Sequence, residues 1–365
     1  MKKYFIALLV LCASVFSSLF FSPIVLAQEE TLEGEVARIV EEKQIIPVGA
    51  KELQLYQKLQ ILITKGSLKD KTIIIENGTM AMSNVQKYAV GDELVIHAGK
   101  DFEGNDMFYI TDYVRRSALF WLFFIFVIMA VIIGRWQGAT SLIGMAISFL
   151  IIFTFILPKI SAGNDPVWTS ILGSLMIIPA TFLLSHGVNK KTVIAIIGTL
   201  VALVITGLLA NAFVAAAKLT GFSSEEASFL QAYHPGLINM KGLLLAGIII
   251  GVLGVLDDIT ISQSAIVKQL KEADPGLEAD DLYKKAMAVG RDHIASMVNT
   301  LILVYTGAAL PLLLIFINNP HPFSEIVNYE IIADEIVRTL VGSIGLIVAV
   351  PITTLIAAFA AEGKA

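Results

Sequence analysis

Long apolar runs, each close to the length that crosses a bilayer, dominate the last two thirds of this chain. A membrane-spanning helix needs about 20 consecutive apolar residues, because the hydrocarbon core is about 30 Å thick. Only 16% of the 365 residues are charged, whereas soluble domains average about 25%. We therefore predict a multi-pass membrane bundle of about seven helices. The predicted spans are 117–134, 138–158, 167–186, 192–215, 242–266, 294–318 and 337–360.

The first 27 residues have the pattern of a secretory signal peptide. Lys2 and Lys3 precede an apolar stretch, and small residues lead to Ala27 before polar Gln28. This three-part pattern is typical of a cleavable signal, so we predict cleavage after Ala27. An uncleaved membrane anchor is the alternative, because the apolar stretch is longer than usual. Cys12, the only cysteine, lies in this segment.

Residues 28–115 differ in kind from the rest of the chain. They carry 15 acidic and 10 basic residues, which predicts a soluble, mildly acidic domain and no nucleic-acid surface. Short β-rich runs separated by turn signals predict five strands and a small all-β, OB-like barrel. These runs are 34–41, 53–64, 71–76, 93–98 and 107–114.

The export signal and the charge distribution together predict the orientation. If residues 28–115 are exported, seven spans leave the C-terminus in the cytoplasm and residues 116–365 form the transmembrane domain. Nine Lys and Arg then face the cytoplasm and six face outside, which favours this orientation under the positive-inside rule. We therefore expect a multi-pass protein of a bacterial plasma membrane, with residues 28–115 extracytoplasmic.

The fifth span ends in an unusual polar group. Gly247, Gly251, Gly254, Asp258 and Ser262 are spaced three or four residues apart, so they share one helical face. The glycines predict close packing of a neighbouring helix, and the face ends in a carboxylate and a hydroxyl. Its neighbour in sequence, the aspartate at 257, points about 100° away, and we interpret it as a bystander.

The sixth span opens with a second polar group. Asp292, Ser296, Asn299 and Thr300 fall on one helical face at its start, next to Arg291. Polar side chains inside a membrane usually turn toward the protein. The fifth and sixth spans meet at the same membrane face, so we expect Asp258 and Asp292 at similar depth, with Arg291 near enough to neutralise one of them.

Two motifs carry a family resemblance. The sequence GVLGVLDDITIS at 251–262 is similar to the pattern GxLGxxxDxxxS, and GRDHIASMVNTLILVYTGAALP at 290–311 is similar to GRD…NTL…Y.G..LP. Both patterns occur in the YibE/F family of bacterial multi-pass membrane proteins, which this chain resembles. The resemblance implies a plasma-membrane protein, often encoded beside a second family member. It selects Asp258 rather than Asp257 and implies no established activity.

Several functions fit these patterns. A mid-helix aspartate costs about 2.5–3.5 kcal/mol on insertion scales, so such residues indicate function by default. We favour a permease whose substrate-binding or ion-binding residues are Asp258, Ser262, Arg291, Asp292, Ser296, Asn299 and Thr300. The alternative is a membrane-embedded interaction or signalling protein whose exported β domain docks another protein.

Two less favoured readings stay open. The polar residues could act only as glue between helices, or Asp258 and Asp292 could form an intramembrane aspartyl hydrolase. We expect a protein that is not an enzyme, and the sequence assigns no catalytic residue, metal ligand or cofactor. The expected partners are the lipid bilayer and either a second YibE/F-family protein or another copy of this chain.

Overall fold

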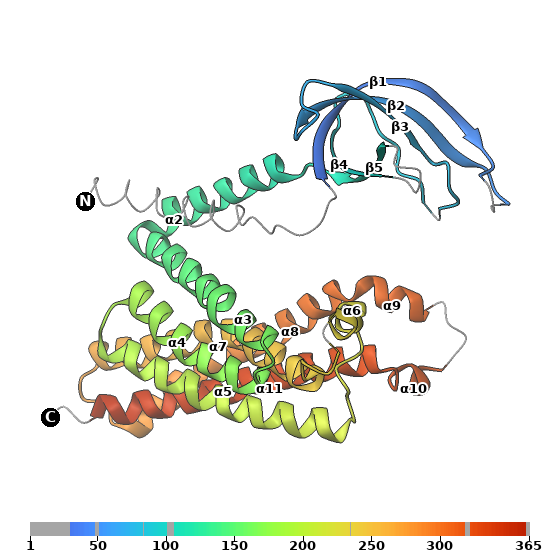
Figure 1. Cartoon of the computed structure of the whole chain (residues 1–365). Coiled ribbons are helices and arrows are strands. Elements are labelled where there is room, and N and C mark those ends of the chain that lie inside the picture. The colour runs from blue at the N-terminus through green and yellow to red at the C-terminus, as the bar shows by residue number, and fades with distance from the viewer. Residues whose placement is uncertain are drawn as a thin grey trace. The chain divides into compact units, whose positions relative to one another are not determined.

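The computed structural model describes residues 30–47, 51–82, 84–100, 106–233, 235–317 and 322–362. These form two compact units, which divide between Met129 and Ala130 (Figure 1). One unit is built mainly of strands and the other of helices. The predicted signal peptide, residues 1–27, lies outside the described residues.

The first unit is a five-stranded antiparallel sheet that curves into a half-barrel (Figure 1). Alternate residues of the strands point inward, and Leu32, Leu59, Ile61, Leu94 and Ile96 form its buried core. This confirms the predicted all-β domain of five strands. In spatial order, the strands are β3 (Thr72–Asn77), β2 (Gln54–Lys65), β1 (Glu30–Ile45), β4 (Glu93–Lys100) and β5 (Asp106–Tyr113).

One buried amide fastens a loop to this sheet. Gln57 of β2 is fully buried. Its side-chain amide donates to the Tyr88 carbonyl at 3.0 Å, and its carbonyl accepts from the Tyr88 amide at 2.9 Å. The pair of hydrogen bonds mimics a strand ladder, so the segment before β4 is held without a strand of its own.

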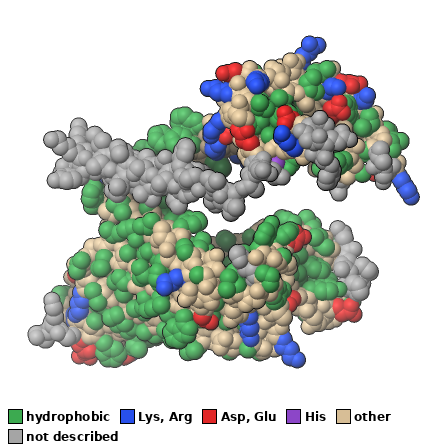
Figure 2. Space-filling model, in the orientation of Figure 1, with side chains coloured by type: hydrophobic (Ala, Val, Ile, Leu, Met, Phe, Trp, Pro, Cys, Tyr) green, Lys and Arg blue, Asp and Glu red, His purple; other side chains and the backbone are tan. Residues whose placement is uncertain are grey.

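The second unit is helical, and apolar side chains cover most of its visible face (Figure 2). An apolar exterior is what a bundle in contact with lipid requires. Its first helix, α2, begins before the boundary between the units. The helices are α2 (Arg116–Ile151), η1 (Ile152–Ile156), α3 (Leu157–Ser161), α4 (Pro166–His186), α5 (Lys190–Ala216), α6 (Glu225–Tyr233), α7 (Met240–Ala273), α8 (Ala279–Ala308), α9 (Leu310–Ile317), α10 (Phe323–Ile326) and α11 (Glu330–Glu362).

Among the described residues, five helical stretches are long and apolar enough to cross a membrane, and a sixth is obtained if α8 and α9 count as one span. The predicted number of about seven is therefore not confirmed. The spans predicted at 117–134 and 138–158 both lie in the 46-residue stretch Arg116–Ser161, in which two helices meet at a kink at Arg135, where φ is 51°. Another predicted span, 294–318, bends by 70° where α8 meets α9.

Helices α5, α7 and α11 pack against one another in the centre of the helical unit (Figure 1). Glycines allow the close approach. A Cβ added at Gly198 of α5 would lie 2.4 Å from the Thr353 hydroxyl of α11, and one at Gly345 of α11 would lie 2.2 Å from the Thr206 hydroxyl of α5. Small residues at a helix interface are typical of membrane bundles, where van der Waals contact drives association.

Candidate functional site

Helix α7 carries the first of the two polar motifs, and its ends are well defined. The Asn239 side chain accepts a hydrogen bond from the Gly242 amide at 3.0 Å and caps the N-terminus. The helix then runs unbroken to Ala273. One side of it faces the centre of the bundle, with Leu256, Ile259 and Gln263 fully buried. The other side is open in this chain.

The glycine stripe lies on the open side. Gly247, Gly251 and Gly254 are all exposed. A Cβ added at Gly247 or Gly254 would meet nothing within 4 Å among the described residues, and one at Gly251 would meet only the Tyr305 hydroxyl, at 3.8 Å. Close packing of a neighbouring helix against these glycines stays a prediction. Within this chain, the close helix contacts occur at other glycines.

Asp258 is exposed on the same stripe, and Ser262 follows it in a half-buried position. The imidazoles of His186, at the end of α4, and His293, in α8, lie close enough to interact electrostatically with its carboxylate. Helices α4 and α8 therefore each place an imidazole near the carboxyl group of α7 that both helical spacing and the motif select. Neither histidine belonged to the predicted site.

Asp257 is the more enclosed of the two aspartates. It faces α4, where the Thr181 side chain interacts with its carboxyl group. One carboxylate oxygen, Oδ1, is buried and has no hydrogen-bond partner among the described residues. Asp257, which its direction on the helix predicts to be a bystander, lies closer to the protein interior than Asp258. Its spacing to two buried polar residues of α7, Thr260 and Ser264, could have indicated this, because they follow it by three and seven positions.

Helix α7 also has polar side chains on the side that faces the centre of the bundle, where they meet hydroxyl groups of α5 and α11. Thr260 lies 2.7 Å from Thr199 of α5, oxygen to oxygen, and also donates to the Leu256 carbonyl at 2.9 Å. The Thr354 hydroxyl of α11 lies 3.0 Å from Gln263 Oε1. All four side chains are fully buried. These pairs connect three helices and leave little room for a ligand, so they fit a structural role.

The predicted residues of α8 are all exposed, namely Arg291, Asp292, Ser296, Asn299 and Thr300. Arg291 forms no ion pair with Asp258, nor with any other residue that the structure describes. Ser296 and Thr300 follow His293 by three and seven positions, which places them on the strip that faces Asp258. Asp292 and Asn299 are seven positions apart and share a strip that faces further away.

Two contacts fix how α8 runs along α7. Gly290 lies against Gln263, and Tyr305 lies against Gly251. The two helices are therefore antiparallel, and Asp258 is level with residues close to Ser296. Asp292 then lies about one turn, roughly 5 Å, from the level of Asp258. The expected similarity in depth agrees with this arrangement.

No group of three or more His, Cys, Asp or Glu side chains in the described ranges has a geometry that could hold a metal ion. The site is thus a set of carboxylates, imidazoles and hydroxyls at membrane depth, drawn from α4, α7 and α8. Such groups can bind a proton, a cation or a polar solute, because carboxylates accept and hydroxyls both donate and accept.

Comparison with known proteins gives one match. The family model described as YibE/F-like protein covers residues 122–363, which is most of the chain and contains both polar motifs. No curated protein and no solved structure matches.

Proposed function

The chain belongs to the YibE/F-like family, and we propose that it is a permease with an intramembrane polar site centred on Asp258. One observation carries the proposal: the Asp258 carboxylate is accessible and has imidazoles from two other helices as neighbours. A carboxylate that only joined helices would be expected to have a partner side chain at bonding distance. An accessible carboxylate at this depth can instead take up and release a cation or proton.

The neighbouring groups have separate roles in this proposal. Asp258 binds the transported cation or the coupling proton, and His293 exchanges protons with it or changes its affinity through charge. Ser262, Ser296 and Thr300 supply neutral oxygen ligands. Asp257 is held against Thr181 and keeps a second carboxyl group beside the first. Arg291 and Asp292, exposed on α8, attract or repel a solute through their charge before it binds, and exposed Asn299 supplies a neutral polar group.

We propose further that the protein lies in a bacterial plasma membrane, with the β unit outside and the C-terminus in the cytoplasm. The N-terminal export pattern supports this arrangement. A single cysteine introduced at exposed Lys87 in a Cys12→Ser background should react with a membrane-impermeant maleimide on intact spheroplasts. A cysteine at Glu362 should react only after the membrane is opened. Labelling of Glu362→Cys on intact spheroplasts would contradict the orientation.

Transport is tested with the full chain in proteoliposomes on a solid-supported membrane. The membrane is challenged in turn with protons, divalent cations, phosphate and amino acids, and charge movement is recorded. We expect the wild-type protein to give a current with at least one of these, and Asp258→Asn to abolish it. Asp281→Asn, which removes an exposed carboxylate from the first turn of α8, is the matched control and should keep the current.

Two results would contradict the permease. One is a current that Asp258→Asn leaves unchanged, and the other is a wild-type protein that moves no charge with any solute of the panel. The second result would favour the alternative function, a membrane-embedded interaction partner.

The open glycine stripe supports that alternative. A Cβ added at Gly247 or Gly254 would meet nothing within 4 Å among the described residues, and small residues are the typical contact points between membrane helices. A second copy or another member of the family is the expected partner. Two differently tagged copies should then co-purify, and Gly251→Leu should abolish co-purification. Gly207→Leu, at another glycine with open space around it, is the control.

A further inference from the structure

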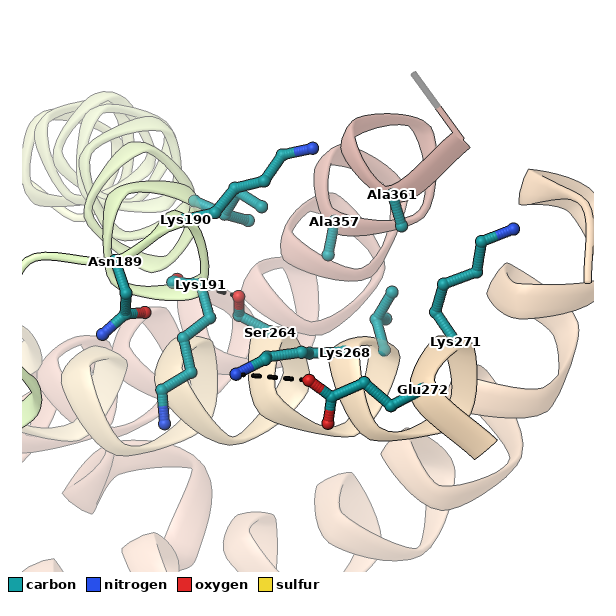
Figure 3. A pocket seen from close by; sticks show the side chains of 11 residues that line it. Asn189, Lys190, Lys191, Ser264, Lys268, Lys271, Glu272, Ala357 and Ala361 are labelled. Carbon is teal, nitrogen blue, oxygen red and sulfur yellow. Dashed lines mark hydrogen bonds and ion pairs between the residues drawn. The ribbon is translucent and has the colours of Figure 1, made fainter. Parts of the chain in front are cut away.

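A pocket of about 430 Å³ opens at the end of the helical unit where α5 begins and α11 ends (Figure 3). It is lined by side chains of three helices: the first turns of α5, the C-terminal half of α7 and the last turns of α11. Two hydrogen bonds hold the walls together. Lys190 donates to the Ala360 carbonyl, and Ser264 donates to the Lys191 carbonyl at 2.8 Å.

The lining is strongly basic. It contains four lysines, Lys190, Lys191, Lys268 and Lys271, and one acidic residue, Glu272, which leaves three net positive charges. Glu272 lies 3.5 Å from Lys268, and both side chains are exposed, so this pair is screened by solvent.

None of the other three lysines forms an ion pair among the described residues. Lys190 and Lys271 donate to backbone carbonyls, which satisfy hydrogen bonds but carry no net charge. Lys191 forms no ion pair with any residue in the described ranges. Among the described residues, the pocket lining therefore carries four lysines against the single carboxylate of Glu272.

The remainder of the lining is mainly apolar, with Ile194, Val267, Ala357 and Ala361 among its residues. A pocket that combines lysine ammonium groups with aliphatic surface suits a ligand that has an anionic head and an apolar body. Basic pockets between membrane helices bind the head groups of anionic lipids in this way. A volume of this size is within the range of ordinary ligand sites.

We propose that this pocket binds a phosphate-bearing anion, and that its occupant is the head group of an anionic phospholipid. Lysine binds phosphate as a point charge, and the lysines stand at a helix end, where a bundle in a bilayer meets the head groups. The proposal is independent of the permease, because none of its residues belongs to the site around Asp258.

The test compares two double variants of the full-length protein in detergent micelles. Lys191→Gln/Lys268→Gln removes two charges from the pocket but keeps the lysines that donate to carbonyls. Lys284→Gln/Lys285→Gln removes two charges from α8 at the same end of the bundle, outside the pocket, and is the control. Melting temperature is measured as phosphatidylglycerol, phosphatidylcholine or inorganic phosphate is added, because a ligand of the folded state raises it.

We expect phosphatidylglycerol, and not phosphatidylcholine, to raise the melting temperature of the wild-type protein and of the control. The pocket variant should need about thirty-fold more phosphatidylglycerol for the same shift, from the usual contribution of two lysines to anionic-lipid binding. Ala361→Leu, which fills the apolar lining without changing charge, should also weaken the response.

The other outcomes are equally decisive. A similar shift with inorganic phosphate, lost in the pocket variant, would support a phosphate site whose source is soluble. Equal responses of the pocket variant and the control would overturn the proposal, because the lysines would then act only as general surface charge. A wild-type protein that responds to neither phosphatidylglycerol nor phosphate would also overturn it.

Discussion

The two sides of α7 are built from similar residue types but are used differently. On the buried side, Thr260 and Gln263 meet hydroxyl groups of α5 and α11 at 2.7 and 3.0 Å. On the open side, a Cβ added at Gly247 or Gly254 would meet nothing within 4 Å among the described residues, and Asp258 is exposed, with the imidazoles of His186 and His293 near enough to interact electrostatically. Polarity within a membrane helix therefore does not by itself indicate function. Polar groups that find partners hold the bundle together, while those without partners remain available to a ligand or another chain.

The largest expected effect distinguishes packed glycines from open ones. Gly198→Leu places side-chain atoms where Thr353 already lies, because even a Cβ would be 2.4 Å from its hydroxyl. We expect a loss of about 3 kcal/mol or more in the free energy of unfolding, at the upper end of overpacking effects, and poor accumulation in the membrane.

The matched substitution on the open side is Gly247→Leu, which meets no neighbour. It should change the free energy of unfolding by less than about 0.5 kcal/mol. Both are measured by denaturant titration in micelles. Equal destabilisation of the two variants would show that the two sides of α7 do not differ as described.

The second effect concerns the buried hydrogen bond between the Thr354 hydroxyl and the Gln263 amide oxygen. Thr354→Val keeps the shape of the side chain but removes the hydroxyl that lies 3.0 Å from Gln263 Oε1. The buried amide oxygen of Gln263 is then left unpaired, so we expect a loss of about 1–2 kcal/mol in the free energy of unfolding. Thr300→Val on exposed α8 is the control and should be close to neutral. A neutral Thr354→Val would contradict a structural role for this pair.

A third, smaller effect should separate the two aspartates. Asp257 has a buried carboxylate oxygen without a hydrogen-bond partner among the described residues, and an unpaired buried polar group is unfavourable. Asp257→Asn removes the ionisable group and should raise the free energy of unfolding by about 0.5–1 kcal/mol. A clear destabilisation would mean that the folded protein stabilises the ionised carboxylate of Asp257.

The smallest effect is expected at the neighbouring position. Asp258 is exposed. Asp258→Asn should therefore leave the melting temperature unchanged and change the free energy of unfolding by less than about 0.5 kcal/mol. Charge movement in proteoliposomes should nevertheless be lost. A variant that unfolds more easily and also loses transport would place Asp258 among the residues that hold the bundle together.

Local sequence signals predicted helices and strands well where capping or turn residues mark the ends of the element. The span predicted at 167–186 is α4, Pro166–His186. Asp165 caps its first turn by accepting from the Trp168 amide, and Gly187, with φ of 74°, ends it. The strand predicted at 93–98 is β4, after a turn at Gly91 with φ of 92°.

Periodicity could not predict which side of a helix faces the centre of the bundle. Spacing correctly grouped Gly247, Gly251, Gly254 and Asp258, but the direction of that face depends on α5 and α11, whose contacts are remote in sequence. Arg135 shows that a basic residue between apolar runs can mark a boundary. The spans predicted at 117–134 and 138–158 are two helices that meet at a kink at this residue, where φ is 51°.

The buried hydroxyl pairs also have a mechanical consequence. Because Thr199–Thr260 and Gln263–Thr354 fix the register of α5, α7 and α11, we expect these three helices to move as one rigid body. No comparable buried pair joins α8 to α7 among the described residues, and the 70° bend between α8 and α9 offers a hinge. Alternating access in transporters commonly arises from one bundle rocking against another. In the proposed permease, such rocking would move His293 toward or away from a stationary Asp258. The electrostatic surroundings of Asp258 would then change as the transport path opens.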